Sequence, residues 1–437
     1  MRTRFAWIAA VLALVLLGFV VACSTKYSSS SNGLVVIASR DSKVMQTFSL
    51  SLSNGHVSQI NNTSGPPTPG LPSSVLLDPA GAFVYLMVTQ DPTLPAGAGN
   101  LTGIAAFQVA SDGKLTAATT TPLSNTTLTI GSTCESIPVI PVALTMDSAG
   151  KFLFVANSGT ADAAGNSVPG SVSVFAIGSN AALAEVSPVS CTSPNTPGSP
   201  FPLPVQTGGS TPSASALAPT PTVFPAQFAP CSGVAAPATQ NLYVTDSIDN
   251  VVLNYSVSST GALSLVPTAA VSTGTLPSGV VVDACNRFVY VANTNSNNVS
   301  AYTICTAVNL SAQPPCLSAD YSLHPVAGAP YPVGDLPGPI KVDAYANFLY
   351  VVNTGSSSVS EFRISSATGT LTAGSPATVA TNSGPNSIAI RSDDTWLFVA
   401  NTNSATVSQY AITPASGGLT PQSPFTTLNF PSGVAVK

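Results

Sequence analysis

The sequence has few charged side chains. Only 7% of its 437 residues are Asp, Glu, Lys or Arg, and the formal net charge is −5. Of the twelve Lys and Arg residues, Arg2, Arg4 and Lys26 lie near the N-terminus, and the others are scattered along the chain. A protein that binds a nucleic-acid backbone needs clustered basic residues. The composition therefore excludes nucleic acid as a partner.

Motifs of the common hydrolytic and redox sites are also missing. The chain contains no HExxH, GxSxG or CxxC, the spacings that serve zinc proteases, nucleophile-elbow hydrolases and dithiol enzymes. No run of carboxylates has the spacing of a calcium loop. We therefore predict no metal and no other cofactor. A divalent cation that bridges carboxylates is the alternative, and no motif supports it.

Long apolar runs are confined to the N-terminus. MRTR is followed by FAWIAAVLALVLLGFVV, and Cys23 then follows a small residue. This arrangement is typical of a secretory leader and resembles a bacterial lipobox. We expect residues 1–23 to be a lipoprotein signal peptide that ends at lipidated Cys23, and 24–32 to be a flexible tether. A transmembrane anchor is the alternative.

The residue after this cysteine bears on localisation. Ser24 follows Cys23, which resembles the Gram-negative pattern that sorts lipoproteins to the outer membrane. We expect an extracytoplasmic body that is lipid-anchored to the outer membrane of a Gram-negative-type bacterium, with the anchor as its only contact with a membrane.

A repeated unit fills the rest of the chain. The unit runs from a Pro/Gly turn and apolar strand (277–283) to an aromatic strand (287–293) and a third strand (298–304), and a fourth strand follows. Copies of the aromatic strand are VVIAS at 35–39, FVYLM at 83–87, FLFVAN at 152–157, LYVTD at 242–246, FVYVAN at 288–293, FLYVVN at 348–353 and WLFVAN at 396–401. Seven four-stranded units predict an all-β, seven-bladed β-propeller over residues 33–437.

The two ends of the repeat region complement each other. FPSGVAVK at 430–437 matches the first strand of a blade, whereas GLVVIAS at 33–39 matches a second strand. We expect the C-terminal strand to complete the first blade, since this closes the ring and removes an exposed sheet edge.

A family resemblance follows from the turns that precede the aromatic strands. The segments DPAGAFVY, DSAGKFLF, DACNRFVY and DAYANFLY resemble YVTN-type repeats and the seven-bladed lactonase-like propellers, a group that includes bacterial 6-phosphogluconolactonase. The resemblance covers about residues 33–437. It implies the propeller fold and raises lactone hydrolysis as an activity, but the shared residues are those that build blades.

Most of the repeated polar and aromatic residues are interpreted as structural. A short carboxylate before a tight turn accepts hydrogen bonds from the turn backbone, and Asn at a strand end tolerates a left-handed conformation. The Asp set is Asp78, Asp147, Asp283 and Asp343; the Asn set is Asn157, Asn293, Asn353 and Asn401. The predicted inter-blade core is Tyr85, Phe154, Tyr243, Tyr290, Tyr350 and Phe398.

Ligand binding is expected on the rim of the central channel, where blades differ. By resemblance, the loops between second and third strands and between blades surround the channel mouth. The predicted rim residues are Arg40, Asp41, Lys43, Asp91, Asp162, Asp335, Asn295 and Asn403. This rim is neutral to mildly acidic. Only two of its residues are cationic, Arg40 and Lys43. A phosphorylated lactone would need a cluster of cations, so this rim argues against such a substrate.

Three residues are the candidates for catalysis. Opening a lactone needs an activated water and a group that stabilises the oxyanion. Asp246 and Asp249 are candidate bases on the rim, and Lys341 replaces the Leu, Thr, Val or Ala of other blades on the innermost strand. His56 and His324, the only histidines, are predicted to lie away from the channel.

Two functions stay open at this point. The favoured hypothesis is a monomeric scaffold that presents loops to a protein or glycan partner in the cell envelope. The alternative is a hydrolase that opens a neutral sugar lactone, or another neutral lactone, at the channel mouth. The Pro/Ser/Thr-rich insertion at about 191–231 is interpreted as a lid, a partner-binding arm or an ornament.

The cysteine content indicates an oxidising compartment. Apart from Cys23 the chain has an even number of cysteines: Cys134, Cys191, Cys231, Cys285, Cys305 and Cys316. We predict a Cys191–Cys231 disulfide that closes the insertion, and one disulfide within the set Cys285, Cys305 and Cys316.

Overall fold

The structure is a computed structural model. It describes residues 32–60, 66–95, 101–123, 126–130, 133–137, 139–161, 167–186, 201–202, 214–219, 240–266, 270–306, 316 and 320–437. The predicted signal peptide with Cys23, most of the tether and most of the insertion lie outside these residues, as do Asp162, Cys191 and Cys231. Within the described residues, no helix is long and apolar enough to cross a membrane.

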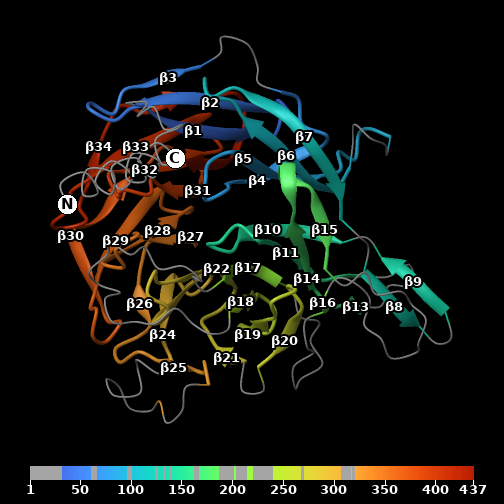
Figure 1. The fold of residues 1–437 in the computed structure, drawn as a ribbon. Helices are drawn as coiled ribbons and strands as arrows, with labels where there is room; N and C mark the ends of the chain where they lie inside the picture. The colour runs from blue at the N-terminus through green and yellow to red at the C-terminus, as the bar shows by residue number, and fades with distance from the viewer. Residues whose placement is uncertain are drawn as a thin grey trace, which may run out of the picture.

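The strands form a ring of seven antiparallel sheets (Figure 1), which confirms the predicted all-β, seven-bladed propeller. From the channel outward, blade one is β36 (Pro431–Val436), β1 (Asn32–Ser39), β2 (Val44–Ser51) and β3 (Val57–Gln59). Blade two is β4 (Leu71–Leu77), β5 (Phe83–Thr89), β6 (Gly103–Val109) and β7 (Leu115–Pro122). Blade three is β10 (Ile140–Met146), β11 (Phe152–Ser158), β14 (Ser171–Ile177) and β15 (Leu183–Glu185), with β16 (Phe201–Pro202).

The other blades repeat this order. Blade four is β17 (Ala214–Pro219), β18 (Gln240–Asp246), β19 (Val251–Val257) and β20 (Leu263–Leu265), with β21 (Val271–Ser272). Blade five is β22 (Pro277–Val282), β23 (Phe288–Asn293), β24 (Asn298–Ile304) and β25 (Leu323–Pro325), with β26 (Tyr331–Pro332). Blade six is β27 (Pro337–Val342), β28 (Phe348–Asn353), β29 (Ser358–Ile364) and β30 (Leu371–Ala380). Blade seven is β31 (Pro385–Ile390), β32 (Trp396–Asn401), β33 (Thr406–Ile412) and β34 (Leu419–Pro421), with β35 (Phe425–Thr426).

Short elements lie outside the blade sheets. They are the hairpin of β8 (Thr126–Ile130) and β9 (Thr133–Ile137), the hairpin of β12 (Thr160–Ala161) and β13 (Ser167–Val168), and the single 3-10 turn η1 (Ser179–Ala181).

The C-terminal strand closes the ring as predicted. β36 pairs antiparallel with β1, with Val36 opposite Ala435 and Ser39 opposite Pro431. In Figure 1 the blue N-terminal strands accordingly lie beside the red C-terminal ones. Because of this closure, β1 has a hydrogen-bonded neighbour on both sides and is not an exposed edge strand.

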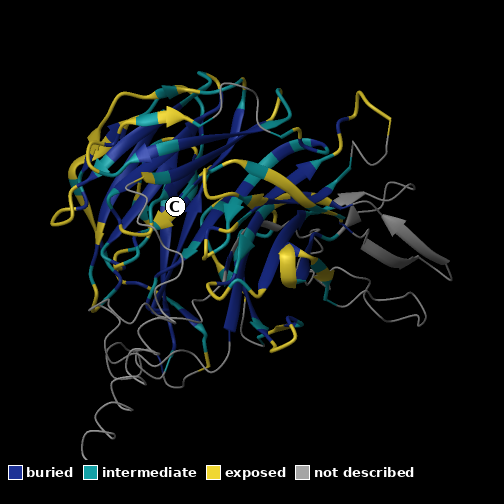
Figure 2. Ribbon diagram, turned by 45° about the horizontal axis from the view of Figure 1, so that its top comes forward, coloured by how far each residue is buried: buried dark blue, intermediate teal, exposed yellow. Residues whose placement is uncertain are grey.

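The apolar core is divided among the seven blade interfaces. Each large apolar cluster combines residues of two neighbouring blades, for example Tyr350 of blade six with Ile388 and Leu397 of blade seven. The six aromatic residues predicted for this core are all between 0% and 1% exposed. Figure 2 shows these central strands as buried.

A contact that recurs in blades five and six fixes the aromatic strand to the next blade. The Tyr350 hydroxyl donates a hydrogen bond to the Gly417 carbonyl oxygen at 2.7 Å, and Tyr290 binds Gly369 in the same way at 3.0 Å. Gly417 has a φ of +73°, and a Cβ there would lie 2.3 Å from the Phe348 ring. Only glycine combines this conformation with so close an approach.

The repeated Asp residues cap turns, as predicted. One oxygen of Asp147 accepts the N–H groups of Lys151 and Phe152, each at 2.7 Å. Asp343 does the same for Asn347 and Phe348, also at 2.7 Å, and burial raises the pKa of Asp343 to about 6. These carboxylates hold the turn that feeds the aromatic strand.

The repeated Asn residues are structural, but by a different mechanism from the one predicted. Their side chains donate across the hairpin to serines of the third strand, as from Asn293 to Ser300 and from Asn353 to Ser360, each at 2.9 Å. The left-handed residue lies four positions later, at Asn297 and Ser357, each with a φ of 48°. The tight turn needs its positive φ at the last turn position, after the strand has ended.

Candidate functional site

A cavity of about 650 Å³ lies between the innermost strands. It is lined by residues of β4, β10, β22, β27, β31 and β36, so six blades contribute to it. Each of these strands begins beside the end of its aromatic strand, as Pro337 beside Asn353, and runs toward the Asp-containing turns. We call the end of the channel at which these strands begin the rim end. The end at which they reach the Asp-containing turns is the far end. A cavity of this volume accommodates a sugar-sized molecule.

Serine hydroxyls gather toward the rim end of the cavity. Ser432 donates to the Pro72 carbonyl oxygen of blade two at 2.8 Å, and Ser278 lies 3.2 Å from the Pro337 carbonyl oxygen of blade six. Ser387 accepts the Val434 N–H at 3.2 Å. These serines join innermost strands of neighbouring blades, and they leave a polar lining around the channel.

Lys341 is the charged residue that the sequence marked on an innermost strand. It lies opposite Tyr350 on β28, the position that Val281 and Ala389 occupy opposite Tyr290 and Phe398 in their own blades. The side chain is exposed to the channel and lines the cavity. The surrounding protein lowers its pKa by desolvation. Among the described residues, no hydrogen bond or ion pair reaches its amine.

Two more ionisable residues line the far end of the cavity, and sequence reasoning missed both. Arg391 forms an ion pair with Asp393 and also donates to the Lys437 main-chain oxygen at 3.2 Å. Both Asp394 carboxylate oxygens accept the Ala344 N–H, at 2.9 and 3.0 Å. Burial, and to a lesser degree the charge of Asp343, raises the pKa of Asp394 to about 6. Both groups are thus already engaged.

A signal for these two residues was present in the repeat. Arg391 occupies the position of the turn Asp of other blades, and Asp394 the position of Gly81, Gly150, Asn286 or Ala346. Asp394 keeps the positive φ of that position, 55°. Departures from the repeat on the far-end turns, rather than on the rim alone, would have marked them.

The candidate bases Asp246 and Asp249 do not line this cavity. Asp246 ends β18 with 0% exposure, at the position that Asn occupies in other blades. Its Oδ1 accepts the N–H groups of Ile248 at 3.0 Å and of Asp249 at 3.2 Å. This carboxylate caps its own turn.

Comparison with known proteins agrees with the ring and its channel. Residues 212–311 and 321–437 match the family model for lactonase, 7-bladed beta-propeller. The chain is a lactonase-like seven-bladed propeller. No curated protein matches its sequence.

Solved structures similar to this lactonase-like propeller span nearly its whole length. A putative 6-phosphogluconolactonase from Bacteroides fragilis has 17% identity and a TM-score of 0.63, with 94% of this chain and 99% of that chain covered. The periplasmic gluconolactonase of Pseudomonas aeruginosa has 16% identity and a TM-score of 0.64, with 93% and 99% covered. At such identities the likeness shows the fold.

The predicted rim residues other than Asp162, which lies outside the described residues, lie on separate turns of the propeller and not in the cavity. Lys43 of blade one and Asp91 of blade two form an ion pair, and hydrogen bonds from Lys43 and Thr93 lower the pKa of Asp91 to about 2. Asn297 donates to Asp335 at 3.2 Å. The structure therefore brings together only pairs of neighbouring loops. The remaining rim residues are exposed: Arg40, which lies over the Phe430 ring, Asp41, Asn295 and Asn403.

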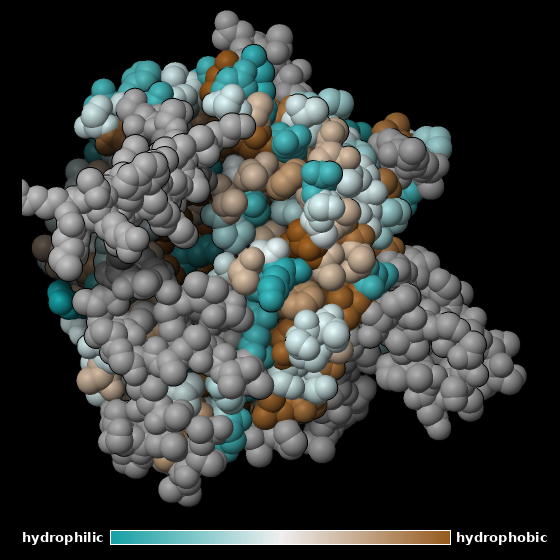
Figure 3. Space-filling view, in the orientation of Figure 1, coloured by the Kyte–Doolittle hydropathy of each residue, from teal (hydrophilic) through white to brown (hydrophobic). Residues whose placement is uncertain are grey.

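The described face of the propeller mixes polar and apolar side chains. Figure 3 shows hydrophilic and hydrophobic residues interleaved over this face. Among the described residues, the ion pairs given by the structure number four.

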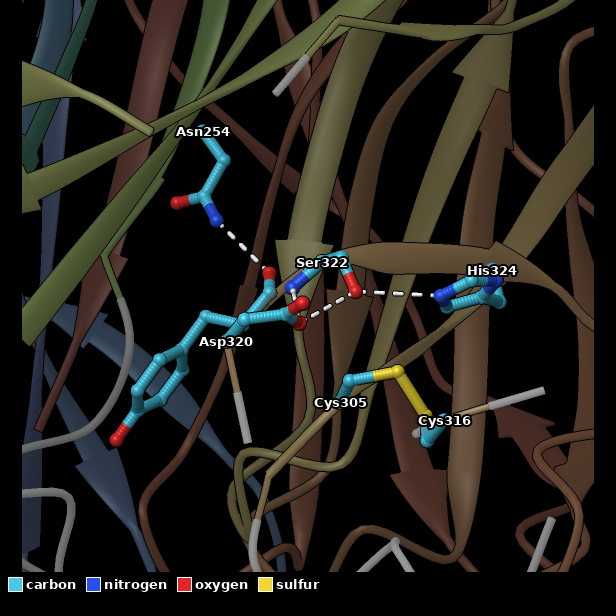
Figure 4. The surroundings of a disulfide bond; sticks show 7 residues. Asn254, Cys305, Cys316, Asp320, Ser322 and His324 are labelled. Atoms are coloured by element: carbon cyan, nitrogen blue, oxygen red, sulfur yellow. Dashed lines mark hydrogen bonds between the residues drawn. A yellow bond between two sulfur atoms is a disulfide. The ribbon is translucent and has the colours of Figure 1, made fainter. Parts of the chain in front are cut away.

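A disulfide joins Cys305 and Cys316 (Figure 4), which confirms the predicted bond within the set Cys285, Cys305 and Cys316. Cys285 is disulfide-bonded as well. His324 lies close to the Cys305–Cys316 sulfurs, and its Nε2 is 3.2 Å from the Ser322 hydroxyl. Oxidised sulfurs are not thiolate ligands, so this trio is structural. His324 and His56 lie away from the cavity, as expected.

Proposed function

We propose that this lactonase-like propeller opens a small neutral lactone in its central cavity. The observation that carries the proposal is Lys341, an amine that faces the cavity without a protein partner in the described part of the chain. The names of the two solved relatives, a gluconolactonase and a putative 6-phosphogluconolactonase, suggest the reaction class. Their low identity leaves the chemistry to be argued from this cavity.

The chemistry assigns Lys341 the role of general base. Desolvation favours the neutral amine, which can take a proton from a water molecule as that water attacks the lactone carbonyl carbon. The tetrahedral intermediate then collapses, the ring C–O bond breaks, and the lysine ammonium returns the proton to the departing alkoxide. The new carboxylic acid loses its proton to solvent, so the product is a hydroxy-carboxylate.

A neutral substrate fits the charge of the cavity. The described cavity lining holds two basic residues, Lys341 and Arg391. Arg391 is paired with Asp393, and the Asp394 carboxylate, which accepts the Ala344 N–H, adds a negative charge, so no cluster of cations is present among the described residues. A phosphate dianion needs several cationic or N–H donors. The proposal therefore excludes a phosphorylated lactone as the preferred substrate.

The test is hydrolysis of a panel of neutral and phosphorylated sugar lactones by the full chain. Turnover of a neutral lactone should fall about a hundredfold or more in Lys341→Met and in Lys341→Arg, because neither residue can act as the base. Lys151→Met, an exposed lysine on the turn of blade three, is the control. Wild-type turnover that survives in Lys341→Met would overturn the proposal.

The second candidate function is a non-catalytic scaffold. The observation that favours it is the absence, within the described cavity lining, of a free carboxylate or histidine base beside Lys341. The exposed rim loops would then meet a protein or glycan partner. A lack of turnover on every lactone, with or without divalent cations, would select this function.

We further propose an extracytoplasmic, lipid-anchored monomer. The lipobox-like segment before Cys23 supports the anchor. Expression of Cys23→Ala beside the wild-type chain in a Gram-negative host tests it. Mass spectrometry should find lipid on an N-terminal Cys23 in the wild type, whereas the variant should keep its apolar leader; a wild type without lipid on Cys23 would contradict the anchor.

A further inference from the structure

We infer that the cavity holds a binding site for a hydroxy-carboxylate monoanion, with the Lys341 ammonium group as its anion-binding group. The choice of a hydroxy acid as ligand rests on the proposed lactone opening, whose product belongs to this class. The site itself rests on two side chains of the cavity, Lys341 and Asn386.

Among the residues that the structure describes, no group forms an ion pair or a hydrogen bond with the Lys341 amine. The ionisable groups around it are Arg391 and Asp394, which line the same cavity, Asp343, two positions later in the chain, and Glu361, which lies at the same register on β29 and accepts the Leu419 N–H. Asp343 accepts two N–H groups of its own turn, and Asp394 accepts the Ala344 N–H. Arg391 pairs with Asp393, and the Tyr350 hydroxyl donates to Gly417. An ammonium in such surroundings lacks a counter-charge, which a bound anion would supply.

Asn386 provides a second and independent indication. It lies on β31, the strand beside β27, and lines the same cavity. Its Oδ1 is buried and has no hydrogen-bond partner among the described residues. A buried amide oxygen without a donor is costly. A ligand hydroxyl would donate to it, so the two groups together suit a molecule that carries both a carboxylate and hydroxyls.

Binding of such an anion should be linked to proton uptake. Desolvation by the surrounding protein disfavours the charged form of Lys341 in the channel, whereas a neighbouring carboxylate favours it. A carboxylate that enters the cavity therefore raises the pKa of Lys341. At a pH where part of the amine is neutral, the complex takes up protons from the buffer.

Isothermal titration calorimetry of the full chain with sodium gluconate tests the site. The matched probes are sorbitol, which lacks the carboxylate, and acetate, which lacks the hydroxyls. Gluconate should bind at least about tenfold more tightly than either probe, since hydrogen bonds to charged groups are the stronger ones. Titrations in two buffers of different ionisation enthalpy at pH 8 to 10 measure proton uptake, and affinity should fall as the pH rises.

Two substitutions of Lys341 separate charge from protonation. Lys341→Met should lose gluconate binding, whereas Lys341→Arg, which stays charged, should keep binding and lose proton uptake. Asn386→Ala should weaken gluconate and leave acetate unchanged. Thermal unfolding of each variant checks the fold. Equal gluconate affinity in wild type and Lys341→Met, or no gluconate binding by the wild type, would overturn the site.

Lactone turnover measured in the same preparations keeps the two proposals apart. Turnover without gluconate binding overturns the anion site and leaves the proposed reaction. Gluconate binding that depends on Lys341, without turnover, supports the site and overturns the hydrolase.

Discussion

The guanidinium of Arg391 donates a hydrogen bond to the main-chain oxygen of Lys437 at 3.2 Å. The Lys437 side chain in turn donates to the Ala80 carbonyl oxygen at 2.9 Å. Blade seven is thereby joined to the closing strand of blade one, and blade one to blade two. Arg391 stands where other blades have a turn carboxylate. The ring is thus closed by polar contacts as well as by strand pairing.

Arg391→Ala should lower the free energy of unfolding by about 1–2 kcal/mol, because it leaves the Lys437 oxygen without this donor. Urea denaturation measures the change. The control is Lys114→Ala, whose ion pair with Asp112 is exposed on both sides and should be worth little. Equal effects of the two substitutions would show that the Arg391 contact adds nothing to closure.

Gly417→Ala should destabilise the protein by about 2–4 kcal/mol, because a Cβ would meet the Phe348 ring and the backbone is left-handed there. The adjacent Gly418→Ala is the matched control, since the nearest atom to its Cβ is the Ser416 hydroxyl at 3.2 Å. Thermal unfolding should separate the two variants. Comparable melting temperatures would contradict the inter-blade contact.

Glu361→Gln should stabilise the protein above neutral pH. Burial raises the pKa of Glu361 to about 7, and one oxygen accepts the Leu419 N–H at 3.2 Å. The folded state thus binds the proton more tightly than the unfolded state, so the wild type loses stability as the pH rises from about 4.5 to 7. The gain at pH 8 should be about 1–3 kcal/mol, with little difference near pH 4.

The corresponding residue of blade seven indicates that an amide fits this position. Gln409 lies opposite Phe398 as Glu361 lies opposite Tyr350, and it donates to the Gly55 carbonyl oxygen at 2.6 Å. Denaturant titrations of wild type and Glu361→Gln from pH 4 to 8 give the comparison. Parallel stability curves would show that Glu361 does not titrate in this window.

The pH profile of kcat/KM for the proposed lactone hydrolysis should fall on the acid side as Lys341 becomes protonated. Because the base is the neutral amine, kcat/KM should rise with pH up to the pKa of Lys341, which desolvation by the surrounding protein places below the ordinary lysine value. The measurement is the initial rate of opening of a neutral lactone against pH, corrected for its spontaneous hydrolysis. A rate that falls with rising pH over this range would exclude Lys341 as the base.

The sequence repeat predicted the blades, their number and the closing strand, because each blade of a propeller is encoded by a local pattern of strands and turns. Lys341 was found as a departure from this pattern. The sequence does not indicate Arg391 and Asp394 as cavity residues, because rim loops are recognised by their variability whereas the cavity is built by the innermost strands and the far-end turns. Asp246 appeared as a rim base, but its burial and turn contacts depend on how blade four packs, which spacing does not reveal.

The direction of β1 has a consequence for how the protein would stand on a membrane. Ser39 lies at the rim end of the channel, beside Pro431, so the strand begins with Asn32 at the far end. A tether from a lipid at Cys23 would therefore reach the propeller from that side, over at most about 30 Å when fully extended. The rim would face outward, toward arriving solutes, and Lys341 would sit at the membrane-proximal part of the channel.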